Sequence, residues 1–191
     1  ESNRRKRAVL EDDLARETYA EHTRLMASQH ANQYQQLVRW SEAKLSYLGV
    51  RESIDTYADA QFHQSVFDSF VKELDATKAT SVASLRKLGG VIRERKHQSA
   101  LSTYTYEKSE ELSAHEADIE KRVEEVTRLG GIKGSVLQDH VERTALQDKV
   151  RLWVKQHQDL FGKLRSWYEE KKSYLERTEV IGSAADAELH V

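Results

Sequence analysis

Histidine is the residue type with the widest chemical repertoire in this sequence, because the chain holds eight histidines and no cysteine. A neutral imidazole binds metal ions and exchanges protons close to neutral pH. A zinc-protease helix requires His-Glu-x-x-His, but the nearest pair, His115-Glu116, has no second histidine at that spacing. We therefore predict no metal site and no cofactor, and we interpret the histidines as surface or packing residues.

A glycine-rich segment at residues 130–135, Gly-Gly-Ile-Lys-Gly-Ser, superficially resembles a phosphate-binding loop. A true loop of this kind has the spacing Gly-x-x-x-x-Gly-Lys-Ser/Thr and follows a β-strand. Neither condition is met here, so nucleotide binding is not predicted. Acidic pairs such as Glu110-Glu111 lie on predicted helix faces beside lysine and arginine, which is typical of solvent-exposed salt bridges. With no convergent acid, base or nucleophile, we predict that the chain is not an enzyme.

A short basic neck at residues 1–5, continued by Lys6 and Arg7, is the strongest charge cluster in the sequence. The whole chain has a net charge of −2, which gives no overall field to attract nucleic acid or an anionic membrane. A bilayer span needs roughly 20 consecutive apolar residues, and the sequence has no such run. We expect no nucleic acid, no membrane span and a cytoplasmic location.

The composition favours long helices. Proline is absent, only eight glycines occur among 191 residues, and charged residues make up 32% of the chain. Good helix formers with few breakers, and too little apolar material for a thick core, are typical of thin helical bundles. The fold class predicted is all-α: an elongated three-helix bundle with left-handed coiled-coil packing.

Apolar periodicity predicts three helices in a first repeat at 6–129, over residues 6–48, 55–95 and 102–129. Each helix has one stripe that faces its neighbours, which we call its seam. The predicted seam of the first helix is Leu10, Leu14, Leu25, Tyr34, Leu37, Trp40, Leu45 and Leu48. That of the second is Phe67, Phe70, Leu74, Thr77, Ser81, Leu85 or Ser84, Leu88 and Ile92. That of the third is Leu112, Glu116, Ile119, Val123 and Val126.

The glycine cluster has a second interpretation, as a connector at residues 130–136. Glycine costs a helix about 1 kcal/mol relative to alanine but does not forbid it. The connector is therefore either a kink in one helix shared between repeats or a short loop. We favour a kinked or locally frayed helix.

An internal repeat is the most specific feature of the sequence. A shift of 127 residues places 10–64 onto 137–191 without a gap. Identical pairs include Leu10/Leu137, Arg16/Arg143, His30/His157, Leu37/Leu164, Trp40/Trp167, Glu42/Glu169, Lys44/Lys171 and Leu48/Leu175. A supersecondary unit copied in tandem produces such a register, so residues 137–191 are predicted to be the first helix and the start of the second helix of a truncated second repeat.

The two copies suggest which residues matter for packing. Structural core anchors are predicted at Trp40, Trp167, Leu37, Leu164, Tyr47 and Tyr174. His30 and His157 occupy equivalent positions, which indicates a packing role for the imidazole or, as the alternative, a pH-sensitive contact. A lone helix over 137–176 leaves a stripe uncovered, and we predict that another chain or a swapped segment covers it. The predicted self-association seam is Trp153, His157, Leu160 and Leu164.

The pattern Leu37-x-x-Trp40-x-x-x-Lys44-x-x-x-Leu48 resembles the signature of spectrin repeats. Within that superfamily, the segment from Asp13 to Trp40 and the segment 102–107, Ser-Thr-Tyr-Thr-Tyr-Glu, are most similar to rod repeats of α-actinin. The glycine cluster departs from the uninterrupted helix that joins such repeats.

The resemblance implies a structural rod or spacer and dimerisation segment of an actin-crosslinking cytoskeletal protein. It implies an antiparallel homodimer, F-actin binding through calponin-homology domains outside this segment, and EF-hands beyond it. Other cytoskeletal proteins are further possible partners. One alternative is an adaptor rod like those of plakins or nuclear-envelope linkers. A third, less favoured because the charges are mixed, is a membrane-curving module of the BAR type, which needs a basic concave face.

Overall fold

The computed structural model describes residues 2–178, 180 and 182–189; residue 1 of the basic neck and the end of the second repeat, 190–191, lie outside them. The described residues are all-α apart from one short β-hairpin. The chain divides into two compact units, Glu1–Val141 (unit 1) and Glu142–Val191 (unit 2). The prediction of an all-α helical protein is confirmed.

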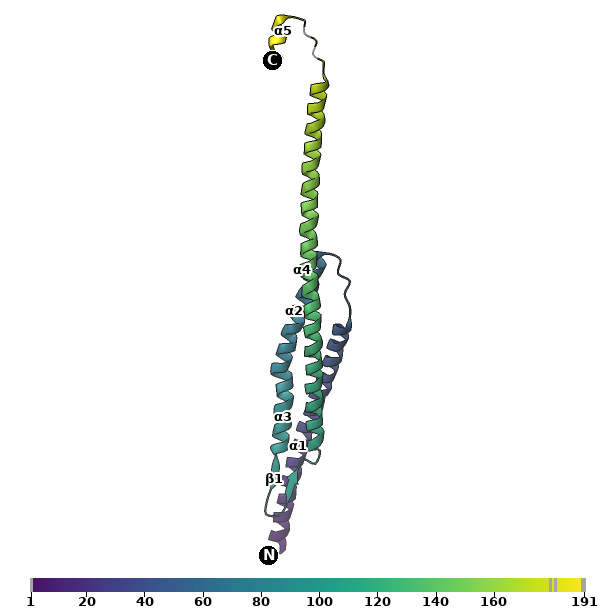
Figure 1. Ribbon diagram of the computed structural model, residues 1–191. Coiled ribbons are helices and arrows are strands. Elements are labelled where there is room, and N and C mark those ends of the chain that lie inside the picture. The colour runs from purple at the N-terminus through teal and green to yellow at the C-terminus, as the bar shows by residue number, and fades with distance from the viewer. Residues whose placement is uncertain (1, 179, 181, 190–191) are drawn as a thin grey trace. The chain divides into compact units, whose positions relative to one another are not determined.

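Unit 1 is a bundle of three helical segments that lie side by side (Figure 1). The segments are α1 (Ser2–Gly49), the run of α2 (Tyr57–Thr77), η1 (Lys78–Val82) and α3 (Ala83–Glu94), and the part of α4 (Ser109–Glu176) that precedes residue 142. The remainder of α4 and the short α5 (Ala184–Leu189) belong to unit 2.

The loop between α1 and α2 ends at a capping box. The Thr56 hydroxyl accepts a hydrogen bond from the Asp59 backbone N–H at 3.1 Å, and the Asp59 carboxylate accepts one from the Thr56 backbone N–H at 3.1 Å. These bonds satisfy amides that the first turn of a helix leaves without partners, so the sequence Thr-x-x-Asp fixes where α2 begins.

The observed seam of α1 differs from the predicted one in its first half. Leu10 and Leu14 are 68% and 69% exposed, and Leu25 is also exposed, so the prediction for these three leucines was wrong. The buried residues of α1 are Ala20, Thr23, Ala27, His30, Leu37, Ser41 and Leu48. They are three, four or seven residues apart, which is the spacing of a coiled-coil seam. Most are small or polar, because closely approaching helices leave little room between their backbones.

The second helical segment contains a turn of π-helix, η1, that shifts its seam by one position. Leu74 and Val82 are both buried, eight positions apart, whereas a strict heptad would have put Ser81 at the second place. Ser81 is exposed, so this part of the prediction was wrong. One extra residue in a π-turn moves every later side chain round the helix. Leu85 and Ile92 then return to the core, both fully buried.

The glycine cluster does not interrupt the helix, because α4 continues through residues 130–136 without a break and this segment lies inside unit 1. The predicted connector therefore lies within a continuous helix, and the short-loop alternative is wrong. A Cβ atom at Gly134 would lie 2.8 Å from the Phe67 ring, and one at Gly130 would lie 3.2 Å from the Phe70 ring. The two glycines thus make room for two phenyl rings from α2.

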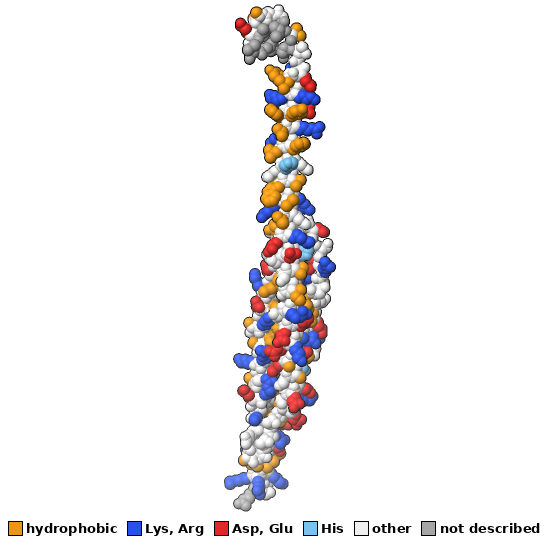
Figure 2. Space-filling model, viewed as in Figure 1, with side chains coloured by type: hydrophobic (Ala, Val, Ile, Leu, Met, Phe, Trp, Pro, Cys, Tyr) orange, Lys and Arg blue, Asp and Glu red, His pale blue; other side chains and the backbone are white. Residues whose placement is uncertain are grey.

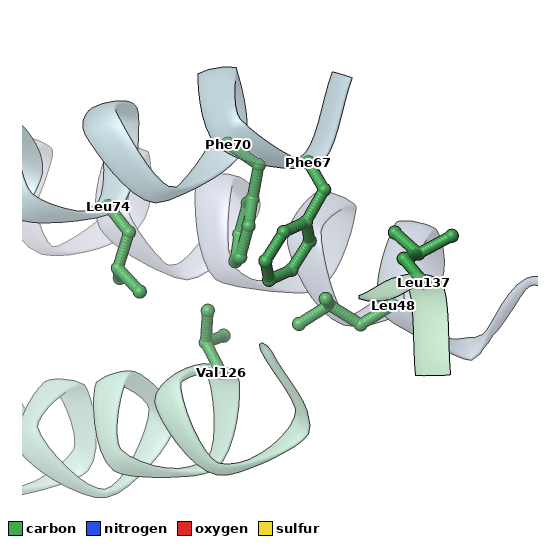
Figure 3. Packing of buried hydrophobic residues seen from close by; sticks show 6 residues of the cluster. All are labelled: Leu48, Phe67, Phe70, Leu74, Val126 and Leu137. Atoms are coloured by element: carbon green, nitrogen blue, oxygen red, sulfur yellow. The ribbon is translucent and has the colours of Figure 1, made fainter. Parts of the chain in front are cut away.

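The rings belong to a core cluster at this end of unit 1. Phe67 and Phe70 point from α2 toward Val126 of α4 and Leu48 of α1 (Figure 3). Burial continues along α4 past the glycines. Gly130, Lys133 and Leu137 are buried as well, and they follow Val126 at steps of four, three and four residues. The third seam is therefore longer than the sequence predicted.

A β-hairpin replaces the start of the third predicted helix. Strands β1 (Lys96–Gln98) and β2 (Thr103–Thr105) pair antiparallel, and α4 begins at Ser109 instead of residue 102. Alternating threonine and tyrosine favour a strand over a helix. The Ser102 hydroxyl donates a 2.6 Å hydrogen bond to Asp12, which attaches the hairpin to α1.

Candidate interaction surface

The first copy of the repeated tryptophan uses its polar edge as well as its ring. The indole Nε1 of Trp40 donates a hydrogen bond to Glu73 Oε1 at 2.8 Å, and Lys44 Nζ donates one to Glu73 Oε2 at 2.7 Å. The hydrogen bonds from Lys44 and Trp40 lower the pKa of the Glu73 carboxyl. One carboxylate on α2 therefore joins two side chains of α1 that the repeat duplicates.

His30, the repeated histidine, is fully buried at the centre of a polar layer. Its ring stacks on His115, with centroids 5.9 Å apart, and His115 stacks on Tyr34 with centroids 4.0 Å apart. His30 Nε2 lies 3.6 Å from Glu116 Oε1, and neither ring nitrogen has a hydrogen-bond partner. Burial lowers the pKa of the His30 imidazole, although the Glu116 carboxylate acts to raise it.

Glu116 is held on its other side by α3. Arg93 donates to both carboxylate oxygens, at 3.0 and 3.1 Å, and this bidentate geometry is the strongest form of such a pair. Gly89 of α3 lies so close to Glu116 and His30 that a Cβ there would meet both side chains. The layer therefore connects α1, α3 and α4.

Lys133, from the glycine cluster, is buried and contacts the loop after α1. Its Nζ donates to the backbone carbonyls of Val50 at 2.9 Å and Tyr47 at 3.2 Å, and it pairs with Glu52. Burial acts to raise the pKa of Glu52, but the hydrogen bond and charge of Lys133 lower it overall. The lysine that suggested a phosphate loop is thus a structural ion-pair residue.

In unit 2, in contrast to the buried contacts of unit 1, the helix over residues 142–176 carries a continuous stripe of exposed large side chains. Figure 2 shows hydrophobic side chains along this helix. We call the stripe the open face: Val150, Trp153, Val154, His157, Leu160, Phe161, Leu164, Trp167 and Tyr168. These positions recur at three- and four-residue steps, so they share one side of the helix. An apolar stripe of this length on a helix surface marks an interaction site.

The structure supports the repeat at the ends of its helices. Helix α1 ends at Gly49 and α4 ends at Glu176, while α2 begins at Tyr57 and α5 begins at Ala184. Each pair is separated by the same 127 residues that align the two copies in the sequence. The open face is therefore the counterpart of the α1 face that the rest of unit 1 covers.

The predicted core anchors are buried or half-buried in the first copy of the repeat and exposed in the second. Leu37 is buried, and Trp40 and Tyr47 are half-buried against the core. Their counterparts are exposed: Leu164 by 61%, Trp167 by 55% and Tyr174 by 65%. All four residues of the predicted self-association seam, Trp153, His157, Leu160 and Leu164, are exposed as well. The structure thus brings the first set together and leaves the second without contacts across a core.

The sequence-based prediction missed the carboxylate of Glu73 as a contact of α1. Its position was a usable signal, because Glu73 directly precedes the seam residue Leu74 and so lies at the edge of the buried stripe. A carboxylate at such an edge can reach a cation or an indole N–H on the neighbouring helix.

Two other kinds of site have no candidate among the described residues. Among the residues that the structure describes, no group of three or more histidine and acidic side chains could hold a metal ion. No helix in the same part of the chain has both the length and the apolar character of a bilayer span. Comparison with protein-family models, with curated proteins and with solved structures finds no match.

Proposed function

We propose that this chain is a structural segment of a cytoskeletal protein, in which unit 1 acts as a helical spacer and unit 2 provides an assembly surface. Unit 1 supports the spacer role because its three seams cover one another along its length. A closed bundle of this kind holds its two ends at a fixed separation. The pattern around Trp40 that resembles spectrin repeats, and α-actinin rods in particular, favours an actin-crosslinking parent protein.

The observation that carries the assembly role is the open face. Its residues repeat a face that is covered in unit 1, yet its eight hydrophobic side chains are 44–65% exposed, with Val150 the least and Leu160 the most exposed. Leaving several large apolar side chains in water is costly, at about 25 cal/mol per Å². The same surface is therefore expected to bury itself against another helix.

The test is sedimentation of the full chain over a range of concentrations. Leu164→Glu places a charge in the open face, and Leu14→Glu is the matched control because Leu14 is 69% exposed on α1. We expect the wild type and Leu14→Glu to associate as concentration rises, with the two copies antiparallel in the α-actinin-like case. Leu164→Glu should remain monomeric. Association that survives Leu164→Glu would contradict the assembly role.

An adaptor rod that binds other helical proteins is the second candidate. It is favoured by the completeness of unit 1, whose seam residues His30, Leu37 and Leu48 are all covered. A chain with one closed bundle and one open face presents a single docking site. Cosedimentation of this segment with F-actin does not separate the two candidates, since neither places actin binding in this segment. Binding of heterologous helical proteins to the open face does separate them.

A further inference from the structure

Three polar positions that the repeat duplicates have a charged partner in unit 1. Trp40 and Lys44 share the Glu73 carboxylate of α2, with bonds of 2.8 and 2.7 Å. His30 lies 3.6 Å from the Glu116 carboxylate of α4. The partners come from the two different helical segments that cover α1.

The same side chains recur in unit 2, where no carboxylate of the described residues takes the place of Glu73 or Glu116. Trp167, Lys171 and His157 stand where the shift of 127 residues places the counterparts of Trp40, Lys44 and His30. All three are exposed in the structure. The apolar positions between them are also retained, since Leu164 repeats Leu37.

From this we infer that the open face takes a pair of amphipathic helices lying outside these 191 residues, and that each helix supplies one carboxylate. One carboxylate binds the indole N–H of Trp167 together with the Lys171 ammonium, and the other lies beside His157. This inference deepens the proposed function and rests on it.

The spacing of the two carboxylates follows from the helix. His157 and Trp167 are ten positions apart in the sequence, which corresponds to about 15 Å along the axis at 1.5 Å per residue. In unit 1 the equivalent carboxylates are on separate helices, because Glu73 is in α2 and Glu116 is in α4. The arrangement in unit 1 therefore corresponds to two partner helices, with one carboxylate on each.

Charge supports an acidic partner. Between residues 149 and 165 the helix carries five lysine or arginine residues and one aspartate. At 3.6 residues per turn, Lys149 and Arg165 lie along the two edges of the open face. Basic side chains at these edges favour a partner with acidic edges and disfavour a like-charged one.

A second copy of this chain fits the open face less well. In each copy, α2, α3 and the first part of α4 already cover the copy's own α1, as the buried Leu74, Ile92 and Val126 show. Two copies that paired through residues 149–165 of their open faces would bring two predominantly basic segments together. Such pairing is expected to be weaker than binding of the acidic helical pair and to be displaced by it.

The experiment titrates the full chain with a helical-hairpin probe, residues 50–141 of this sequence, which carries both Glu73 and Glu116. Two forms of the full chain serve as receptor: the wild type and Tyr168→Ser. The second restores the serine that is fully buried at the equivalent position Ser41, so that a large side chain does not block the probe. Binding is measured by fluorescence anisotropy of the labelled probe.

We expect the probe to bind at least one receptor and to dissociate its self-associated form. Glu73→Gln in the probe should weaken binding about tenfold, the size of a charge-assisted hydrogen bond to one carboxylate. That loss should vanish when the receptor carries Trp167→Phe and Lys171→Met. The matched control, Trp40→Phe in the receptor, should leave the affinity unchanged, because Trp40 is engaged inside unit 1.

The outcomes separate the inference from the proposed function. If the probe binds the open face but Glu73→Gln and Glu116→Gln have no effect, the inference is overturned and the assembly role stands. Tight self-association that the probe does not displace has the same meaning, with a second copy as the occupant. If the chain neither associates with itself nor binds the probe in either receptor form, both the inference and the proposed function fail.

Discussion

Two helical segments in this protein carry the same stripe of residues, but the stripe is buried in one segment and exposed to solvent in the other. On α1 the stripe containing His30 and Leu37 is buried, whereas 127 residues later His157 and Leu164 are exposed. The residue types are identical at these positions, so the difference arises from the neighbours and not from the helix itself. Unit 1 supplies two covering segments within the chain, and the described part of unit 2 supplies none.

The comparison shows how a tandem helical repeat can make one sequence pattern serve two purposes. Where the covering helices follow in the same chain, the stripe stabilises a closed bundle. Where they are supplied from elsewhere, the same stripe becomes a binding surface whose chemistry can be inferred from the closed copy. Each prediction below changes one copy and uses the other as its reference.

The largest expected difference is between Leu37→Ala and Leu164→Ala. Leu37 is 5% exposed, so its truncation leaves a cavity and should reduce the free energy of unfolding of unit 1 by about 3 kcal/mol. Leu164 is 61% exposed, and its truncation should change that free energy by less than about 0.5 kcal/mol. Urea denaturation followed by circular dichroism measures both. Equal losses would show that the Leu164 side of the chain is covered in solution.

A second comparison lies within the glycine cluster. Gly134→Ala brings a Cβ to 2.8 Å from the Phe67 ring, whereas at Gly131 there is nothing within 4 Å of the added atom. Crowding of the ring should make Gly134→Ala destabilising by about 1–2 kcal/mol despite its better helix propensity. Gly131→Ala should stabilise unit 1 by up to about 1 kcal/mol, because only the propensity changes. Thermal unfolding of the two variants measures both changes in stability. A change of the same sign in both variants would contradict the glycine–phenyl packing.

The glycine cluster also illustrates what sequence patterns could and could not predict here. Composition and periodicity predicted the three helical segments of unit 1 correctly, because these depend on many residues at once. The role of Gly134 depended on one ring from another helix, Phe67, and no local pattern carries that information. The π-turn η1 caused the wrong seam position at Ser81. The strand-forming Thr-Tyr-Thr segment caused the wrong start of the third predicted helix.

The candidate surface was more predictable than the core that explains it. The exposed stripe at Trp153, His157 and Leu160 followed from the periodicity of a single helix. The buried stripe of α1 did not, because Ala20, Thr23 and Ser41 are small or polar and were outweighed by nearby leucines that turn out to face solvent. Hydrophobicity alone therefore misplaces a seam where helices approach closely.

Acidification should distinguish the two histidine positions. The pKa of His30 is lowered by burial, so the unfolded chain binds a proton there more readily than the folded chain does. Stability from this group is fully present above the unfolded pKa of about 6.5 and is lost as pH falls below it. The groups facing His30 are Arg93 from α3 and His115 and Glu116 from α4, and the glutamate partly offsets the loss.

Unfolding by urea between about pH 7.5 and 5.5 tests this, since the carboxylates with lowered pKa values titrate below that range. The wild type should lose stability toward the acid end, and His30→Met should flatten the profile. His157→Met, the same change on the open face, should leave the slope as in the wild type. A wild-type slope that persists in His30→Met would assign the effect to another histidine.

The smallest expected difference concerns the repeated tryptophan. Trp40→Phe keeps an aromatic ring at the core but removes the N–H that donates to Glu73, leaving that half-exposed carboxylate with Lys44 as its remaining partner. The free energy of unfolding should fall by about 1 kcal/mol, the net value of one hydrogen bond. Trp167→Phe should leave it unchanged, because Trp167 is 55% exposed and its carboxylate partner is not among the described residues. Once the acidic helical pair is bound to the open face, however, Trp167→Phe should acquire a cost like that of Trp40→Phe, because the second copy would then be covered as the first one is.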